Sequence, residues 1–232
     1  MRQVVLDTET TGINPKLGHR IIEIGCVELV DRRLTGNHYH TYVNPEREVE
    51  EEAIGVHGIT NEFLVDKPRF AQIAKGFKEF IQGAELVIHN AAFDVGFIDH
   101  EFSLMDPRSQ KVIEYCAVLD TLAMARDRHP GQKNNLDALC KRYGIDNSHR
   151  DLHGALLDAE ILADVYLLLS GGQTAMDLSA AGEKGGDVAS IRRISEDREP
   201  LRVIRASEDE LAAHEKYLDG VAAKAESAIW RR

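Results

Sequence analysis

The stretch VVLDTETTG, residues 4–12, places two carboxylates, Asp7 and Glu9, directly after three apolar residues. Such a run of β-favouring residues predicts a buried strand. Because alternate residues of a strand point to the same face, the two acidic side chains should lie side by side. A carboxylate at the end of a buried strand needs a counter-charge or a metal ion, since burial of an unpaired charge is costly. Taken alone, the D-x-E spacing also fits two acids that face water.

The composition is that of a globular protein with one sizeable core. Of the 232 residues, 43% are hydrophobic and 29% are charged, and no apolar run is long enough to cross a bilayer. No signal peptide is expected, and three cysteines without a C-x-x-C pair favour core thiols in a reduced cytoplasm: Cys26, Cys116 and Cys140. The net charge of −11 excludes a basic nucleic-acid coat. A nucleic acid would be the ligand only if divalent cations and a partner protein supplied positive charge.

Hydrophobic periodicity predicts an α/β fold with helices on the faces of a mixed sheet. Three segments at short spacing favour an antiparallel meander: 3–8, 20–30 and 38–45. Strands then alternate with helices, at 84–90 and 115–121 for the strands and at 70–82, 93–102, 136–144 and 155–169 for the helices. The helix at 136–144 should end at Gly144.

The character of the sequence changes after Ser170. Residues 171–187 are rich in Gly, Ala and Ser, which predicts a flexible linker. Residues near 201–228 again favour regular secondary structure, namely a short strand and then an amphipathic helix. In this helix Ser207 is the expected N-cap and Glu210 completes a capping box. This segment is too short to hold a core alone, so we expect it to dock on a partner.

Two further acids are candidates for the same site as Asp7. Asp94 lies in the first turn of a helix, where the helix dipole alone would favour an acid. The strand before it should end at the same edge of the sheet as Asp7, and in open α/β sheets sites gather beyond strand ends. Asp158 is flanked by Leu157 and Ala159 on the most apolar helix, so it should have a partner, most simply a metal ion.

His153 precedes Gly154 in a loop that allows it to move as a proton carrier, although the chain has ten histidines. Four carboxylates and one histidine suit Mg²⁺ or Mn²⁺, and no thiolate cluster suits zinc. The matching chemistry is phosphodiester hydrolysis with two ions roughly 3.5–4 Å apart. In that chemistry His153 would take the proton from the attacking water.

Three motifs occur in a fixed order: DTETTG (7–12), HNAAFD (89–94) and HGALLDA (153–159). They resemble the Exo I, II and III motifs of DEDD-superfamily 3′–5′ exonucleases, in the variant with His before the last Asp. Longer segments, among them RIIEIGCVELVDRRLTGNHYHTYVNP and NNLDALCKRYGIDNSHRDLHGALLDAEILADVYL, are similar to the epsilon proofreading subunits of bacterial DNA polymerase III. This resemblance implies a ribonuclease H-like fold and strengthens the prediction of a mixed sheet flanked by helices.

The resemblance also implies two Mg²⁺ or Mn²⁺ ions and a role for each motif residue. Asp7 would bridge both ions, and Glu9 and Asp158 would hold the ion that activates water. Asp94 would hold the other ion, partly through water, and His153 would be the general base. Five further residues match positions near the 3′-terminal nucleotide: Thr10, Val56, His57, Asn90 and Phe93.

Several of these positions could also have a purely structural role. Core packing explains Val56 and Phe93 equally well. His89 and Asp120 are either supports behind the site or structural residues, and the structural interpretation is favoured.

The C-terminal part implies partners. QTAMDL (173–178) resembles the peptide by which epsilon subunits bind the sliding clamp, with Gln173, Met176 and Leu178 as anchors; the family pattern usually ends in an aromatic residue. The last segment, with the only Trp at 230, matches the part that docks on the polymerase alpha subunit. The expected organisation is an exonuclease domain (1–170), a flexible linker with the clamp peptide (171–198) and a polymerase-docking tail (199–232).

The leading hypothesis is a metal-dependent 3′–5′ exonuclease that removes mispaired 3′ nucleotides of DNA for a replicative polymerase. It would act in the bacterial cytoplasm, at the nucleoid with the replisome, and not at a membrane. One alternative is a stand-alone exonuclease for DNA repair or RNA trimming, which has no obvious need for the tail. Another is a non-catalytic tether between polymerase and clamp, which has no reason to keep the five catalytic-type residues.

Overall fold

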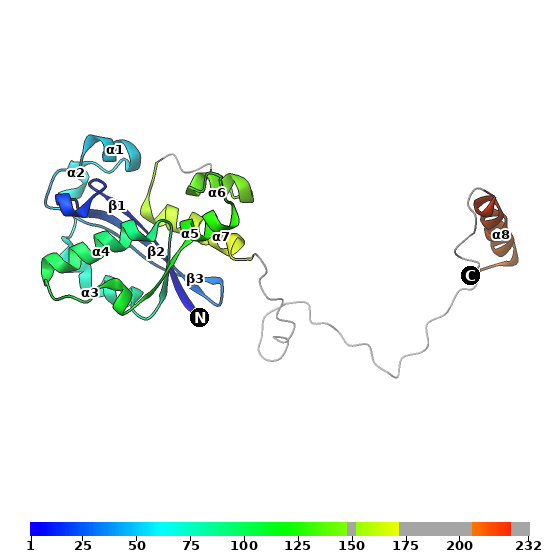
Figure 1. The fold of residues 1–232 in the computed structure, drawn as a ribbon, viewed down its shortest axis with the longest axis horizontal. Coiled ribbons are helices and arrows are strands. Elements are labelled where there is room, and N and C mark those ends of the chain that lie inside the picture. The colour runs from blue at the N-terminus through cyan, green and yellow to red at the C-terminus, as the bar shows by residue number, and fades with distance from the viewer. Residues whose placement is uncertain (148–151, 172–205, 224–232) are drawn as a thin grey trace. The chain divides into compact units, whose positions relative to one another are not determined.

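The computed structural model describes residues 1–147, 152–171 and 206–223 (Figure 1). The chain divides into two compact units, Met1–Met176 and Asp177–Arg232. Within the described segments, no helix combines the length and the apolar character needed to span a bilayer.

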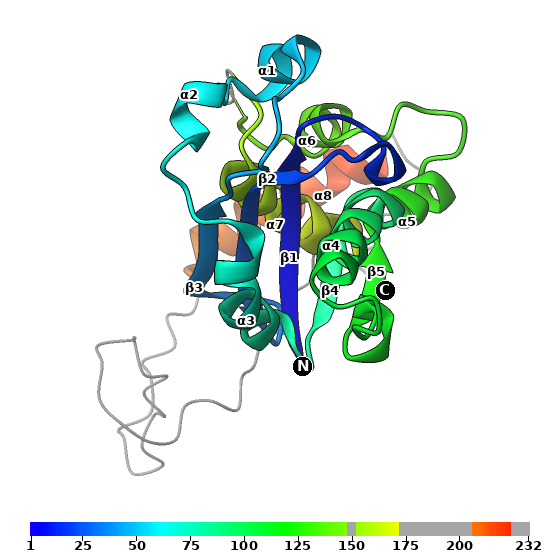
Figure 2. The same ribbon diagram turned by 90° about the vertical axis from the view of Figure 1, so that its left-hand side faces the viewer.

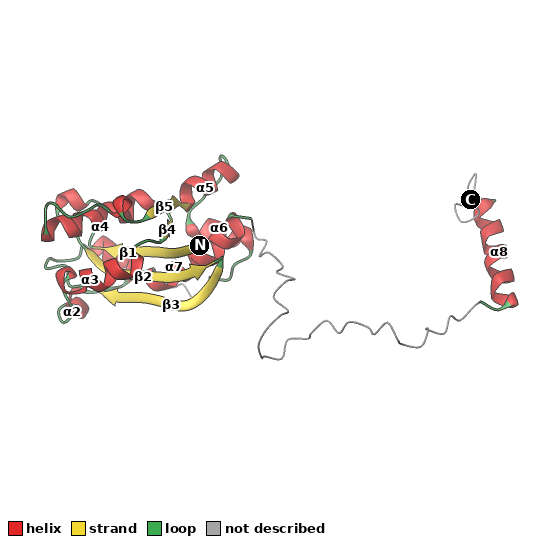
Figure 3. Cartoon of the chain, turned by 90° about the horizontal axis from the view of Figure 1, so that it is seen from below, coloured by secondary structure: helices red, strands yellow, loops and turns green. Residues whose placement is uncertain are grey.

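The first unit is built on one mixed sheet, in which the described strands have the order β3-β2-β1-β4-β5. Their bounds are β1 (Arg2–Thr10), β2 (Ile21–Val30), β3 (Arg33–Tyr42), β4 (Glu85–Ile88) and β5 (Ala117–Asp120). The first three strands are antiparallel, and they run side by side in Figure 3. β4 pairs with β1 and β5 with β4 in parallel. The predicted meander with added parallel strands is therefore confirmed.

Helices cover both faces of this sheet (Figure 2). The bounds are α1 (Glu51–His57), α2 (Asn61–Leu64), α3 (Phe70–Ile81), α4 (Ala91–Met105), α5 (Thr121–Arg128), α6 (Leu136–Tyr143) and α7 (Ala155–Leu169), with short 3-10 turns η1 (Pro15–Leu17) and η2 (Val112–Glu114). Side chains of α3 and α4 share one core cluster with Val4 and Leu6. Side chains of α7 share another with Val5 on the opposite face.

The four helices predicted from periodicity are all present, and α6 ends at Gly144, whose left-handed φ of 69° favours glycine. All three cysteines are buried free thiols, as expected. The short helices α1, α2 and α5 were not predicted. In α1 and α2 only His57 and Leu64 are buried among the described residues, so these helices have almost no apolar periodicity.

The third strand starts earlier than predicted. It begins at Arg33, after a tight turn in which Asp31 and Arg32 have φ angles of 49° and 65°. Two successive positive φ angles are typical of the hairpin turns that match strand twist. Asp-Arg lacks the glycine that usually marks such turns, so the sequence pattern did not indicate it.

In the second unit the structure describes α8 (Glu208–Ala222). The Ser207 amide donates to Glu210 Oε2 at 2.8 Å, and the Glu210 amide donates to Ser207 Oγ at 3.3 Å, which confirms the predicted capping box. The predicted strand before α8 and the linker from residue 172 onward lie outside the described residues. So do four residues with expected roles in partner binding: Gln173, Met176, Leu178 and Trp230.

Candidate active site

Residues of β1 alternate between the two faces of the sheet. Val5 packs in the core cluster beneath α7. Asp7 and Glu9 lie two and four residues further along the strand, so their side chains project from the same face and also point to α7. Thr8 points the other way, and its Oγ1 donates to Asp94 Oδ1 at 2.7 Å. The strand thus presents the two motif acids on one face, as predicted, and uses the residue between them to hold a third acid.

His153 and Asp158 come from the start of α7 and lie against Glu9. One ligand atom from each of the three lies within 4.8 Å of the other two. His153 Nδ1 is 3.2 Å from Asp158 Oδ2; Asp158 is buried, whereas the His153 side chain is 44% exposed. This arrangement can hold one divalent cation and leaves the imidazole accessible to solvent.

Asp94 stands in the first turn of α4 and is only 3% exposed. Burial raises the pKa of its carboxyl to about 7, although the hydrogen bond from Thr8 opposes the shift. A carboxyl group in such surroundings ionises readily only beside a positive charge, because a cation favours the charged form. Asp94 is therefore suited to bind a metal ion from the α4 side.

A cavity of about 330 Å³ opens over the predicted catalytic residues Asp7, Glu9, Asp94, His153 and Asp158. Its wall also includes Thr8, His89, Phe93 and Leu162, and three residues at the start of α6, namely Asn135, Leu136 and Asp137. Carboxylates are the most frequent of its polar side chains, and no cysteine of the described residues lines the cavity. This donor set fits a hard divalent cation.

The two positions with a packing alternative differ in their surroundings. Phe93 lines the cavity and its ring lies 4.9 Å from that of Phe97, so it both packs and faces the site. Val56 is 48% exposed on α1, which argues against core packing. Its carbonyl accepts from the His153 amide at 3.2 Å, so α1 lies beside the loop that carries the histidine.

The other predicted substrate residues are not part of the cavity wall. Thr10 is buried, and its Oγ1 donates to the Gly12 carbonyl at 2.7 Å. His57 is buried, its Nδ1 accepts from the Ile59 amide at 3.0 Å, and burial lowers the pKa of its imidazole. Asn90 is exposed and has a left-handed φ of 67° where α4 begins.

Asp120 and His89 hold neighbouring elements. Asp120 Oδ1 accepts from the Leu122 amide at 2.8 Å and from the Asn90 amide at 3.2 Å, so it caps α5 and fixes the start of α4. His89 Nδ1 lies 2.9 Å from Thr121 Oγ1, and burial lowers the pKa of His89. These contacts favour the structural interpretation of Asp120, whereas His89 also reaches the cavity wall.

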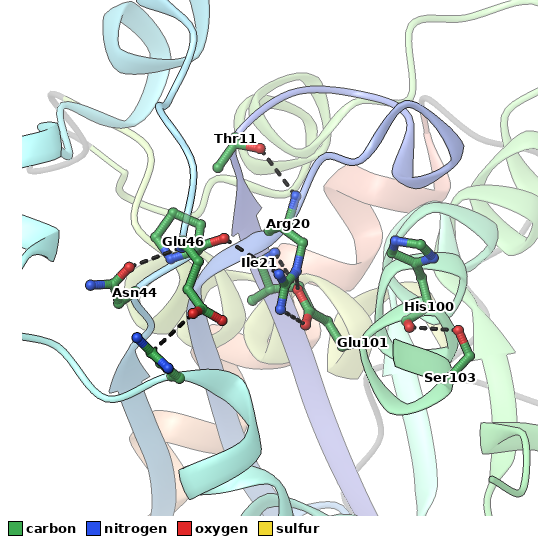
Figure 4. A network of polar contacts seen from close by, with 10 residues as sticks. Thr11, Arg20, Ile21, Asn44, Glu46, His100, Glu101 and Ser103 are labelled. Atoms are coloured by element: carbon green, nitrogen blue, oxygen red, sulfur yellow. Dashed lines mark hydrogen bonds and ion pairs between the residues drawn. The ribbon is translucent and has the colours of Figure 1, made fainter. Parts of the chain in front are cut away.

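An ion pair anchors α4 to the strands (Figure 4). Glu101 is 1% exposed and accepts from Arg20 Nε at 2.8 Å and from Arg20 Nη2 at 2.7 Å. It also accepts from the Ile21 amide at 3.1 Å. The Arg20 amide in turn donates to Thr11 Oγ1 at 3.1 Å. The helix that carries Asp94 is thereby fixed to the ends of β1 and β2.

A glycine allows α7 to approach the sheet. Gly25 lies opposite Asp7 in the β1–β2 register. A Cβ at this position would lie 2.2 Å from both the Ala155 carbonyl carbon and the Leu156 amide nitrogen. The first turn of α7 therefore rests directly on the backbone of β2, next to the motif acids.

The sequence and the fold are similar to those of known proteins. The family model described as exonuclease (RNase T) matches residues 4–166. The chain is 56% identical to the DNA polymerase III subunit epsilon of Escherichia coli (strain K12), covering 99% of this chain and 97% of that one. It is 52% identical to the same subunit of Haemophilus influenzae, covering 94% and 89%. Among solved structures, exonuclease X in complex with 5′ overhanging duplex DNA matches with a TM-score of 0.58 and 26% identity, over 75% of this chain and 95% of that chain.

The protein is a nuclease of the exonuclease family. Its mixed sheet is ribonuclease H-like, its carboxylates gather beyond the strand ends, and the exonuclease model matches most of the chain. Enzymes of this family depend on divalent metal. Within it, the chain belongs to the family of DNA polymerase III epsilon subunits. Its activity is that of a 3′–5′ proofreading exonuclease acting within that polymerase.

Gly25→Ala is expected to lower exonuclease turnover by at least about 100-fold, because displacement of the first turn of α7 by about 1 Å misplaces Asp158. The free energy of unfolding should fall by about 1–3 kcal/mol from overpacking. Turnover on a mispaired 3′ end and urea unfolding measure the two effects. Gly76→Ala on α3 is the matched control, since a Cβ there meets no atom within 4 Å. Equal activity of the two variants would contradict the prediction.

Proposed function

We propose that the cavity holds two divalent cations, Mg²⁺ or Mn²⁺, and that the chain hydrolyses the 3′-terminal phosphodiester of DNA, releasing 5′-mononucleotides. One observation carries the proposal: acidic side chains from β1, α4 and α7 converge on one cavity. Glu9 and Asp158 would hold the ion beside the attacking water, Asp94 the second ion, and Asp7 both. When bound, the ions would supply Lewis acidity to the water and to the leaving 3′ oxygen.

His153 would be the general base. The imidazole tautomer with its proton on Nδ1 can donate to Asp158 Oδ2, 3.2 Å away, and its Nε2 can then accept a proton. The exposure of the ring and the adjacent Gly154 support an approach of His153 to a water in the cavity. Five residues would contact the 3′-terminal nucleotide: Thr10, Val56, His57, Asn90 and Phe93. The place of Phe93 in the cavity wall supports that contact.

His153→Gln tests this mechanism. Turnover on a mispaired primer should fall by about 100-fold or more, since general base catalysis typically contributes that much. His38→Gln on β3, where the side chain is exposed, is the matched control. Turnover equal to that of the control would refute the role of His153.

The partners proposed for the rest of the chain are the polymerase alpha subunit, through 199–232, and the sliding clamp, through 173–178. Support for a docking tail comes from α8, which exposes Leu211 and Tyr217 on a helix with its own capping box. The corresponding organisation is an exonuclease domain over 1–170 and a linker over 171–198, in a cytoplasmic replisome. Capture of the alpha subunit by the full chain, and its loss when 199–232 are removed, tests the assignment.

A further inference from the structure

A carboxylate from a neighbouring strand holds the first turn of α7. Gly154 is the N-cap residue and has no side chain that could accept from the unpaired amides at the helix start. Glu23 of β2 takes this place: its Oε2 accepts from the Ala155 amide at 3.2 Å. A negative charge at a helix N-terminus is also favoured by the helix dipole. Glu23 is 3% exposed, so the contact is shielded from water.

The register puts this anchor next to the motif acids. Glu23 lies directly opposite Glu9 in the antiparallel β1–β2 pair. Directly opposite residues project from the same face, so both carboxylates point to α7. Gly25, two residues further along β2, leaves the space that the first turn of α7 occupies. One strand pair thus supplies both a predicted metal ligand and the contact that seats the helix above it.

The second oxygen of Glu23 is fixed by β3. His40 Nε2 donates to Glu23 Oε1 at 2.7 Å. The His40 ring packs edge-on against Tyr42, with the centroids 5.0 Å apart, and Tyr42 lies opposite Glu23 in the β2–β3 register. A buried carboxylate with both oxygens engaged has one orientation available, because loss of either contact would leave a buried charge poorly paired.

We propose that Glu23, oriented by His40, is a positioning residue that sets the height and rotation of the first turn of α7, and with it the places of His153 and Asp158 relative to Glu9. The Asp158 amide donates to the Gly154 carbonyl at 2.8 Å, so a shift at the helix start is passed directly to Asp158. His153 immediately precedes the same residue. The inference rests on the roles proposed above for His153 and Asp158.

Two substitutions separate the hydrogen bond from the charge. Glu23→Leu removes the acceptor, whereas Glu23→Gln keeps a carbonyl oxygen that can accept from the Ala155 amide. We expect Glu23→Leu to lower kcat on a mispaired 3′ end by about 10–100-fold and to raise the Mn²⁺ concentration for half-saturation by a similar factor, as is typical when a residue that orients a metal ligand is lost. KM for DNA should change less than about 2-fold, and Glu23→Gln should recover most of kcat.

Tyr166→Phe is the matched control. Gln3 Nε2 donates to Tyr166 Oη at 2.7 Å, so this variant also removes a buried strand-to-α7 hydrogen bond, but at the far end of the helix. It should lower stability and leave kcat and Mn²⁺ half-saturation unchanged. If Glu23→Leu does not fold, His40→Leu is measured instead, with a smaller change of the same kind expected.

Hydrogen exchange of the amides of residues 155–158 in the full chain reports the helix position without reference to catalysis. Faster exchange in Glu23→Leu than in Tyr166→Phe, together with lower kcat and weaker Mn²⁺ binding, supports the proposal. Faster exchange with unchanged kcat, or Glu23→Gln behaving like Glu23→Leu, overturns it. The proposed function fails by a different result, namely full activity of Asp158→Asn in the wild-type background.

Discussion

Asp94→Asn should abolish proofreading and at the same time stabilise the protein when metal is removed. The Asp94 carboxyl is 3% exposed, and burial raises its pKa from 3.8 to about 7. The folded state therefore binds a proton more tightly than the unfolded state. The contribution of this carboxyl to the free energy of unfolding is therefore highest below its unfolded pKa. That contribution declines as the pH rises from about 4 to about 7, because the folded protein must then ionise a buried group. Asparagine is neutral throughout and carries no such penalty.

Thermal melts in EDTA between pH 4 and pH 8 measure this effect. The variant and the wild type should coincide at the acid end, which is an internal control for the fold, and the variant should melt at a higher temperature at pH 8. The amide can still accept from Thr8 Oγ1, so the 2.7 Å hydrogen bond seen with Asp94 need not be lost. A variant that melts below the wild type at pH 8 would contradict the inference that the Asp94 carboxylate is destabilising when no cation is bound.

The same variant should lose activity by more than about 1000-fold, because metal-ion stabilisation of the transition state contributes several kcal/mol and each 1.36 kcal/mol is a factor of ten. Added Mn²⁺ should raise the melting temperature of the wild type by ligand linkage, and should raise that of the variant less. The order of stability of the two proteins would then reverse between EDTA and Mn²⁺. Such a reversal is expected of a residue whose charge serves binding and not folding.

The strands could be predicted from the sequence as short apolar runs, and the main helices because their apolar residues recur at helical spacing. The side-by-side arrangement of Asp7 and Glu9 followed from the alternation of side chains along a strand, and both residues line the cavity. Thr8 could have been assigned to the opposite face by the same rule. Asp94 was expected near Asp7 because the strand before it ends at the same edge of the sheet, but its hydrogen bond with Thr8 was not predicted.

Contacts between distant segments could not be read from local patterns. Asn135 caps α6 by accepting from the Ala138 amide at 3.1 Å, but nothing in the neighbouring sequence indicates that α6 begins at the cavity wall. In the sequence, Glu23 is a single acid between Ile22 and Ile24, and no local pattern assigns it a contact. Its partner, the Ala155 amide, lies 132 residues further along the chain, and only the packing of α7 on Gly25 brings the two together.

Arg20→Met should reduce the free energy of unfolding by about 3–5 kcal/mol, because it leaves the Glu101 carboxylate buried without its cation. Glu101 is 1% exposed and would keep only the Ile21 amide, at 3.1 Å, among the donors described above. Arg69→Met is the matched control: Arg69 Nε lies 3.1 Å from Glu46 Oε1, but both side chains are exposed, at 65% and 44%. Loss of an exposed pair should change stability by less than about 1 kcal/mol.

The double variant Arg20→Met/Glu101→Leu separates the value of the ion pair from the penalty of a lone charge. Apolar replacements of similar volume fill the site and bury no charge, so the double variant should recover most of the stability that Arg20→Met loses. Guanidinium unfolding of the two single variants and the double variant gives the coupling energy directly. A double variant as unstable as Arg20→Met would show that the pair itself, and not the unpaired Glu101 charge, holds α4 to the strands. If the double variant is stable, its turnover can be measured. Because α4 carries Asp94, that turnover reports how much the ion pair contributes to the position of the Asp94 carboxylate.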